Sequence, residues 1–253
     1  MNGKIIASGN NKGGAGKTTN AIEITYGLHK RGYKVLLVDL DGQRNATIAL
    51  GQKDANPTIY DALTGRTDIK ETIISTTAGD LIPASANLDT LAQALTGDGR
   101  EYTLKKALEP IAADYDFIVL DLPPAINAAS TNALAAADTL LIAAKAEAFH
   151  LEGVGALFQN VETIKRHCNN DLKIQGIIIT QYRQALALNK AMYENAGRIA
   201  AQLGAKLYEP IRECTKVKEA QALHKSVYEY APRCNAVKDY ETLINDLLED
   251  FKK

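Results

Sequence analysis

Short apolar runs alternate with amphipathic segments along most of the chain. Short runs bounded by glycine, proline or acidic residues are typical of buried strands, and apolar residues three or four apart are typical of helices. The predicted strands are Ile5–Ala7, Lys34–Asp39, Thr72–Ser75, Asp80–Ala84, Asp116–Asp121, Thr139–Lys145, Leu172–Thr180 and Ala205–Glu209. The predicted helices are Ala21–Lys30, Asn45–Leu50, Pro57–Leu63, Leu88–Leu95, Tyr102–Ala113, Asn127–Ala137, Leu151–His167, Leu188–Leu203, Glu213–His224 and Val237–Phe251. We expect Asp68–Thr72 to be a loop.

The alternation of strand and helix predicts an α/β fold, a doubly wound and mostly parallel sheet with helices on both faces. The short strands within residues 72–84 are expected near a sheet edge. The chain has 253 residues, of which 46% are hydrophobic and 23% charged, an ordinary composition for one globular domain. No linker or repeat interrupts it. We therefore predict a single domain over residues 1–253.

Charge and cysteine content restrict the partners and the compartment. The net charge is −1, so the chain as a whole does not require a nucleic acid partner. Residues 181–238, however, carry ten Lys or Arg against five Glu, a local excess of five positive charges. Such a region is either a binding surface for a polyanion or a solvated basic surface. Three cysteines without a C-x-x-C pair argue for a reducing cytoplasm and against a zinc or iron–sulfur site.

A glycine-rich stretch, Ser8–Thr19, joins the first predicted strand to the first predicted helix. Strand, glycine-rich turn and helix form the context of a phosphate-binding loop, in which backbone N–H groups converge on an anion. The residues expected to hold the phosphates are Gly13, Gly14, Ala15, Gly16, Lys17, Thr18 and Thr19. Lys17 would reach the outer phosphates, and the Thr18 hydroxyl would bind Mg²⁺. Asn11 replaces the first glycine of the usual pattern, and its tolerance of left-handed backbone would let the loop close.

Carboxylates follow two of the predicted strands, at the edge where parallel sheets bind ligands. Asp121 ends the apolar run before it and is the candidate metal-binding carboxylate. Asp39 and Asp41 lie at the end of the second strand and share a face if the strand continues that far. A phosphate loop with carboxylates beyond it indicates a nucleoside triphosphatase.

The loop Lys12–Thr19 matches the pattern K-G-G-x-G-K-[ST]-T and so resembles the deviant Walker A motif of the ParA/MinD superfamily. Val35–Thr47 and Asp116–Pro124 extend the resemblance, which is best to small Soj-like ParA partition ATPases. It implies a P-loop ATPase that uses ATP and Mg²⁺. Lys12 would act catalytically across a homodimer on the partner's nucleotide, together with Lys17.

The same resemblance assigns roles around the second strand. Asp41 would orient the attacking water, and Asp39 would support the metal, together with Thr18 and Asp121. Family members usually carry Pro-Gln-Gly after the second aspartate, whereas this chain has Gly42–Arg44, a departure that bears on the rigidity of the loop.

The resemblance also implies residues that contact the adenine base and DNA, and the sequence itself supports these less than it supports the phosphate loop. Gln181 would pair with an adenine edge, and Pro210 and Ile211 would flank the ring, although all three are equally readable as ordinary loop residues. Non-specific DNA binding is implied for basic residues in the last third of the chain. The preferred candidates, grouped around one predicted helix, are Lys216, Lys218 and Lys225.

The implied partners are DNA and a ParB-like centromere-binding protein, in the cytoplasm and on the nucleoid, with no membrane. The last helix is acidic over residues 239–253, which disfavours the alternative of a MinD-like positioning ATPase on an anionic membrane. A metabolic ligase of dethiobiotin-synthetase type, with a similar phosphate loop, is the alternative from another class.

Overall fold

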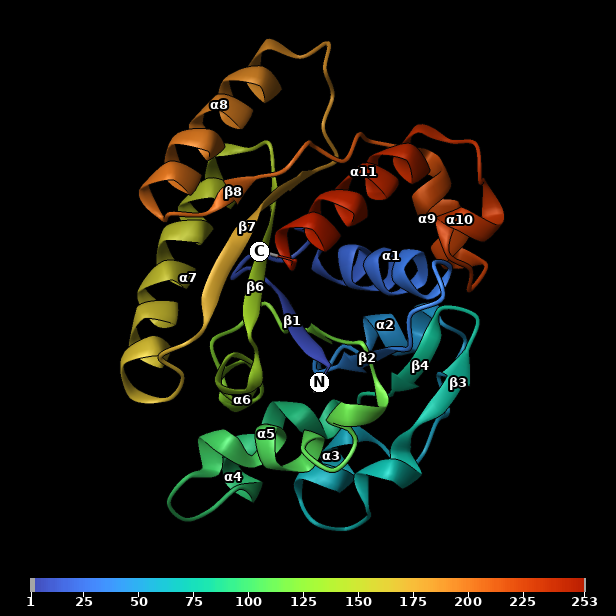
Figure 1. The fold of residues 1–253 in the computed structure, drawn as a ribbon, viewed down its shortest axis with the longest axis vertical. Coiled ribbons are helices and arrows are strands. Elements are labelled where there is room, and N and C mark those ends of the chain that lie inside the picture. The colour runs from blue at the N-terminus through green and yellow to red at the C-terminus, as the bar shows by residue number, and fades with distance from the viewer. Residues whose placement is uncertain (1–2, 253) are drawn as a thin grey trace.

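One eight-stranded sheet forms the centre of the molecule in the computed structural model, which describes residues 3–252 except for the side chains of residues 148–156 (Figure 1). The strands are β1 Lys4–Gly9, β2 Val35–Asp39, β3 Ile74–Thr76, β4 Gly79–Ile82, β5 Phe117–Asp121, β6 Thr139–Lys145, β7 Lys173–Thr180 and β8 Lys206–Leu207. Their order is β3-β4-β2-β5-β1-β6-β7-β8, and only β3 runs antiparallel to its neighbour. The predicted doubly wound, mostly parallel sheet is confirmed, with β3 at an edge.

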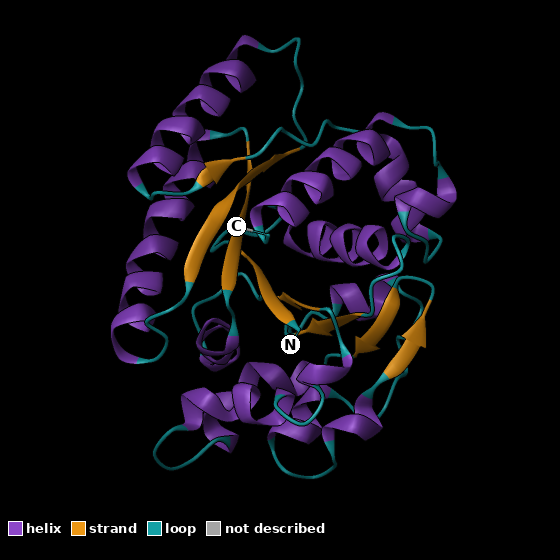
Figure 2. Cartoon of the chain, viewed as in Figure 1, coloured by secondary structure: helices purple, strands orange, loops and turns teal. Residues whose placement is uncertain are grey.

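Helices cover both faces of this sheet (Figure 2). They are α1 Lys17–His29, α2 Asn45–Ala49, α3 Ile59–Leu63, α4 Leu91–Ala94, α5 Thr103–Leu108, α6 Ala128–Ala136, α7 Ala148–His167, α8 Ala187–Gln202, α9 Thr215–Ala222, α10 Val227–Tyr230 and α11 Asn235–Asp250. Two core clusters result, because neighbouring strand residues point to opposite faces. Ile6, for example, packs with α1 and α11, whereas Ala7 packs with α6 on the other side.

Three local predictions differ from the structure. Residues Ile69–Thr72 form a 3₁₀ turn and not an irregular loop, because the Asp68 carboxylate accepts a hydrogen bond from the Lys70 N–H at its start. The helix predicted over residues 102–113 ends at Leu108, because Pro110 has no N–H with which to continue the helical hydrogen bonds. Helix α10 was not predicted at all.

The last helix, α11, packs on α1 and closes the second core cluster. Tyr240, Leu243, Ile244 and Leu247 are buried on its inner face, as expected of a packing helix with a solvated acidic side. Within the described chain, no helix combines the length and apolar character that spanning a bilayer requires.

The chain changes direction across the sheet at β1, since β2 and β5 lie to one side of it and β6 to the other. In open parallel sheets, a ligand crevice forms outside the carboxyl ends of the strands at such a switch point. The loop that follows β1 is therefore placed by topology at the expected binding position.

Candidate active site

The backbone between β1 and α1 turns through two left-handed glycines. Gly14 has φ 70° and Gly16 has φ 89°, both in the region that favours glycine. Gly13 lies outside that region, and a Cβ there would meet nothing within 4 Å, so this glycine keeps the loop surface open. Asn11 is not left-handed either. The loop therefore closes without the unusual conformation that we expected of Asn11.

Strands β6 and β7 hold the loop in place from behind. The Asn10 side-chain amide donates to the carbonyl of Ala143, and its oxygen accepts from the Lys12 N–H at 3.1 Å. The Thr180 hydroxyl donates to the Ala15 carbonyl at 2.8 Å. These bonds leave the loop's own N–H groups available to an anion at the start of α1, where the helix dipole also favours negative charge.

Lys17 lies beneath this loop, 6% exposed, and its Nζ donates to the Lys12 carbonyl at 3.3 Å. Burial lowers the pKa of Lys17, while the carboxylates of Asp121 and Asp41 oppose that shift. The ammonium group thus lies between the loop and two acidic side chains. A buried cation in this position has a strong electrostatic reason to bind phosphate oxygens. Lys12, by contrast, is exposed.

Asp39 and Asp121 end adjacent strands and are register partners between β2 and β5. Both are fully buried. Asp39 accepts hydrogen bonds from the Thr47 N–H at 2.8 Å, the Thr47 hydroxyl at 2.7 Å and the Asp41 N–H at 3.1 Å. Neither oxygen of Asp121 has such a partner among the described residues. The two carboxylates therefore differ. Asp39 stabilises the loop after β2 through its hydrogen bonds, whereas the Asp121 oxygens accept none from the described residues.

The surroundings of Asp39 and Asp121 also shift the pKa of each carboxyl group. Burial raises the pKa of Asp39 to about 6, against the opposing hydrogen bonds from Thr47 and Asp41. Burial and the neighbouring Asp39 raise the pKa of Asp121 well above its usual range, while the nearby Thr18 hydroxyl and Lys17 favour its charged form. Two buried carboxylates side by side, one with orphaned oxygens, are a donor set that a hard divalent cation would stabilise.

Asp41 follows β2, is 6% exposed and faces the same cavity as the phosphate loop. Its carboxylate accepts from the Gln43 N–H at 3.0 Å, and its carbonyl accepts from the Arg44 N–H at 2.8 Å. Arg44 adopts a left-handed φ of 58° to close this turn. A Cβ at Gly42 would lie 2.4 Å from the Asp89 carboxylate, so the segment is packed tightly despite lacking the family's proline.

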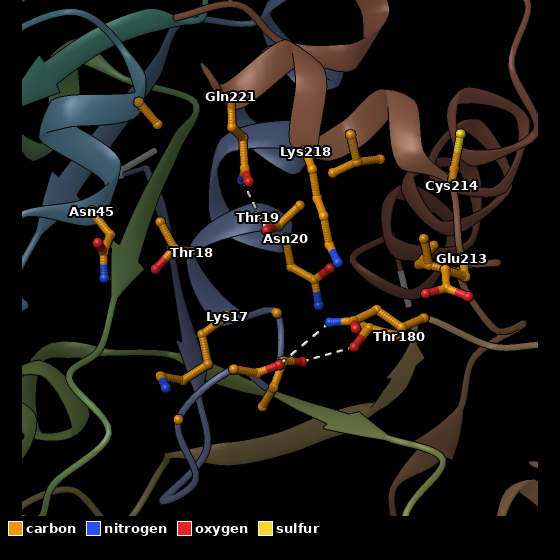
Figure 3. Close-up of a pocket in the computed structure, with 18 of the residues that line it drawn as sticks. Lys17, Thr18, Thr19, Asn20, Asn45, Thr180, Glu213, Cys214, Lys218 and Gln221 are labelled. Atoms are coloured by element: carbon orange, nitrogen blue, oxygen red, sulfur yellow. Dashed lines mark hydrogen bonds between the residues drawn. The ribbon is translucent and has the colours of Figure 1, made fainter. Parts of the chain in front are cut away.

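A cavity of about 600 Å³ runs from the phosphate loop to α9 (Figure 3). Its phosphate end is formed by residues 13–19 and Asp41, and its other end by Gln181, Ile211 and residues of α9. Gln181 thus lies where the base was expected, with its amide donating to the Gly14 carbonyl at 3.4 Å. Pro210 is outside the described lining. Its neighbour Ile211 does line the cavity, and the Ile211 N–H donates to the Ile179 carbonyl at 2.8 Å.

Helix α9 is the part of this site that sequence reasoning missed. Cys214, Val217, Lys218 and Gln221 all line the cavity, and the Gln221 amide donates to the Thr19 hydroxyl at 2.9 Å. The lysines of this segment predict a DNA-contacting helix, and their positions in the sequence do not reveal which side of the helix faces inward.

The three candidate DNA-binding lysines are all exposed, on or just after α9, but they have different surroundings. Lys218 lines the cavity, whereas Lys216 pairs with Glu219 at 2.8 Å on another side of α9. Lys225 follows the end of the helix and is exposed. Because residues two apart on a helix point in different directions, Lys216 and Lys218 would meet DNA from different sides of α9, and the DNA-binding role of the three lysines stays a prediction.

Comparisons with known proteins agree with this geometry. A family model described as an AAA domain matches residues 3–174. The sporulation initiation inhibitor protein Soj of Bacillus subtilis is 34% identical over 97% of this chain and 98% of its own length. The chromosome partitioning protein ParA of Caulobacter vibrioides is 32% identical over 97% of this chain and 94% of its own length.

Among solved structures, a cobyrinic acid a,c-diamide synthase from Mycobacterium smegmatis with bound ADP and magnesium superposes with a TM-score of 0.86. It is 26% identical and covers 99% of this chain, which in turn covers 96% of that structure. The match to the family model and the nearly full-length similarity to Soj and ParA show that this chain belongs to the ParA/Soj family of partition ATPases.

Proposed function

We propose that this protein is an ATP-driven switch for DNA partition, in which ATP binding joins two subunits and hydrolysis separates them. The observation that carries the proposal is the single cavity that brings together the phosphate loop, the Asp41 carboxylate and the pocket wall of α9. Thr18 lines its phosphate end, and the buried strand-end carboxylates Asp39 and Asp121 lie outside the described lining, with Asp121 close enough to Lys17 to oppose the lowering of its pKa. These are the parts that phosphoryl transfer to water needs: an anion cradle, metal-binding oxygens and a carboxylate near the attack position.

The phosphate end would bind the triphosphate through the loop N–H groups and the Lys17 ammonium. Thr18 and the orphaned oxygens of Asp121 would hold Mg²⁺, directly or through its waters, with Asp39 bracing the site from behind. Bound Mg²⁺ supplies positive charge that offsets the charge developing on the phosphates. The fit rests on the buried, unpartnered carboxylate of Asp121.

Asp41 would accept a hydrogen bond from the attacking water and so hold it in line with the outer phosphate. Because this carboxylate already accepts one hydrogen bond from Gln43, its orientation is fixed before water arrives. Positioning by one carboxylate without a stronger base gives slow turnover, which leaves room for a ParB-like partner to accelerate it.

Lys12 would complete the site of a second subunit. It is exposed, and its backbone forms part of the phosphate loop, so its side chain is placed to extend away from its own cavity. A cation supplied by a partner stabilises the transferred phosphate and makes ATP binding favour the dimer. The dimer would bind DNA non-specifically through phosphate contacts, in the cytoplasm and on the nucleoid.

A metabolic ligase remains the second candidate because of the similarity to the protein named cobyrinic acid a,c-diamide synthase. Such an enzyme would use ATP on a small carboxylate and would not need Lys12 from a second subunit. The MinD-like alternative has less support, since the inner face of α11 is occupied by core packing. The role of Lys12 therefore separates the proposals.

The test replaces Lys12 by alanine, with Lys105→Ala as a matched control on the exposed side of α5. We expect Lys12→Ala to bind ATP as a monomer while losing the ATP-dependent dimer, measured by sedimentation, and DNA retention at low salt. The control should behave as the unaltered protein does. An intact ATP dimer in Lys12→Ala would refute the switch, and ATP turnover that requires a small carboxylate would favour the ligase.

A further inference from the structure

Asn20, in the first turns of α1, has a buried hydrogen-bond donor with nothing to donate to. Its side chain is 0% exposed, and it belongs to the lining of the cavity. The side-chain oxygen accepts from the Tyr240 hydroxyl at 2.8 Å, while the amide nitrogen has no partner among the described residues. Leaving a buried donor unsatisfied costs about 1–3 kcal/mol, so such a group calls for an explanation.

The other buried asparagines of the described chain are fully used. Asn132 donates to the carbonyls of Arg100 and Ala128, and accepts from the Leu104 N–H. Asn10 and Asn189 likewise both donate and accept through their side chains. Among the described residues only Asn20 and Asn160 have a buried amide nitrogen without a partner, and of these two Asn20 lines the cavity beside the phosphate loop.

Tyr240 fixes the direction in which the Asn20 amide points. It comes from α11, is buried, and burial together with Glu23 raises its pKa well above the usual range. The hydroxyl therefore keeps its proton and donates it, which holds the amide oxygen toward α11. The nitrogen is left on the opposite side, and in Figure 3 the labelled Asn20 amide points into the open middle of the pocket.

The neighbours of Asn20 indicate which part of a ligand it would meet. Residues 13–19 precede it and form the phosphate end, and the Thr19 hydroxyl is already bonded to Gln221. Asn20 is the next residue along α1, and its amide partner Tyr240 also lines the cavity. Its donor is thus placed beyond the phosphate cradle, toward the wall made by Ile211 and α9.

We propose that Asn20 is a nucleoside-binding residue: its amide, oriented by Tyr240, donates a hydrogen bond to a base ring nitrogen or a ribose oxygen of the bound nucleotide. The proposal rests on the proposed function, because it assumes that this cavity binds ATP. Phosphates have the loop N–H groups and Lys17, whereas the nucleoside half of the ligand brings acceptors that pair with an amide.

The test uses Asn20→Leu combined with Tyr240→Phe. Replacing both partners of the internal hydrogen bond by apolar groups of similar shape spares the fold more than removing one of them. We expect calorimetry to give about a fivefold to tenfold weaker affinity for ADP, the worth of one lost hydrogen bond. Inorganic triphosphate, which has no nucleoside, should bind the variant as it binds the unaltered protein.

Three further measurements sharpen the result. Tyr240→Phe alone keeps the amide but frees its orientation, so its loss of ADP affinity should be smaller. Asn132→Leu is the control for losing a buried asparagine and should leave ADP affinity unchanged. With the unaltered protein, weaker binding of 7-deaza-ADP assigns the contact to the base, and weaker binding of 2′-deoxy-ADP assigns it to the ribose.

Equal ADP affinity in the double variant and the unaltered protein would overturn the role of Asn20. An equal loss for ADP and triphosphate would also overturn it, because the effect would then lie in the phosphate end. If the unaltered protein binds neither ADP nor ATP, the failure belongs to the proposed function and not to Asn20.

Discussion

The two ends of the cavity are built in different ways. The phosphate end comes from one continuous loop and from carboxylates at the ends of neighbouring strands, so its parts are close in sequence or paired by sheet register. The base end collects Gln181, Ile211, α9 and Tyr240, which are separated by tens of residues and come from strand ends, a loop and two helices.

This difference sets the kind of interaction that each end offers. Under the proposed function, the backbone N–H groups and buried charge of the phosphate end would recognise any triphosphate. The amides and apolar wall of the base end would distinguish one nucleoside from another. One contact from α1 links the two ends, the hydrogen bond from the Gln221 amide to the Thr19 hydroxyl, and Glu23 of α1 accepts from Ser226 at the start of α10, outside the described lining. Substitutions at the two ends should therefore separate affinity for phosphate from affinity for the nucleoside.

The largest effect is expected from Lys17→Ala, which removes the buried cation of the phosphate end. Several charge-assisted hydrogen bonds to the phosphates are lost, so affinity for ATP and for inorganic triphosphate should fall by about 100-fold or more. The affinities for ATP and for inorganic triphosphate are measured by calorimetry. If ATP affinity fell while triphosphate affinity did not, the division of the cavity into two ends would be wrong.

The free energy of unfolding is expected to change by about 3 kcal/mol between pH 4.5 and 7 because of Glu23, which joins α1 to the start of α10. Its buried carboxylate accepts from the Val227 N–H at 3.0 Å and from the Ser226 hydroxyl at 2.5 Å. Burial raises its pKa from the ordinary 4.5 to about 7. The folded state therefore holds a proton that the unfolded state releases, and the free energy of unfolding should decrease as the pH rises from 4.5 to 7.

Glu23→Gln cannot titrate, so the difference in stability between variant and unaltered protein should change across that same pH range. Urea denaturation at several pH values provides the measurement, because the slope of stability against pH reports the protons bound in each state. A difference that stays constant from pH 4 to 8 would contradict a raised pKa for Glu23.

The smallest effect is expected from Gln221→Ala, which removes the hydrogen bond between α9 and Thr19. One neutral hydrogen bond is worth about 1 kcal/mol, so ADP affinity should weaken by roughly fivefold with little change for triphosphate. Gln175→Ala is the matched control, since Gln175 bonds the Tyr208 hydroxyl and is outside the described lining. Equal losses of ADP affinity in Gln221→Ala and Gln175→Ala would mean that the hydrogen bond between Gln221 and Thr19 has no specific role in nucleotide binding.

The fold class and the phosphate end could be predicted from the sequence because both depend on short-range patterns. Apolar runs identify the strands, and the loop from Lys12 to Thr19 follows β1 without a break. The positions of Asp39 and Asp121 also follow, since carboxylates at the ends of parallel strands meet at one edge. The left-handed backbone at Gly14 and Gly16 agrees with the glycine pattern.

The base end could not be predicted in the same way. The lysines of α9 suggest an outward-facing helix, yet Lys218 and Gln221 line the cavity, and the Gln221 amide donates to the Thr19 hydroxyl of α1. Of the neighbours Pro210 and Ile211, only Ile211 is in the described lining, and sequence alone does not reveal which of two neighbours faces a cavity. The unused amide of Asn20 is visible only after α11 places Tyr240 beside it.

By itself, the sequence determined an α/β sheet, a phosphate loop at its carboxyl edge and the strand-end acids beside that loop. Tertiary structure alone decided which side of each helix faces the cavity and which buried polar groups stay unpaired. The physical reason is range: periodicity and turn chemistry act within a few residues, whereas side-chain orientation at a site depends on contacts between segments that are distant in the chain.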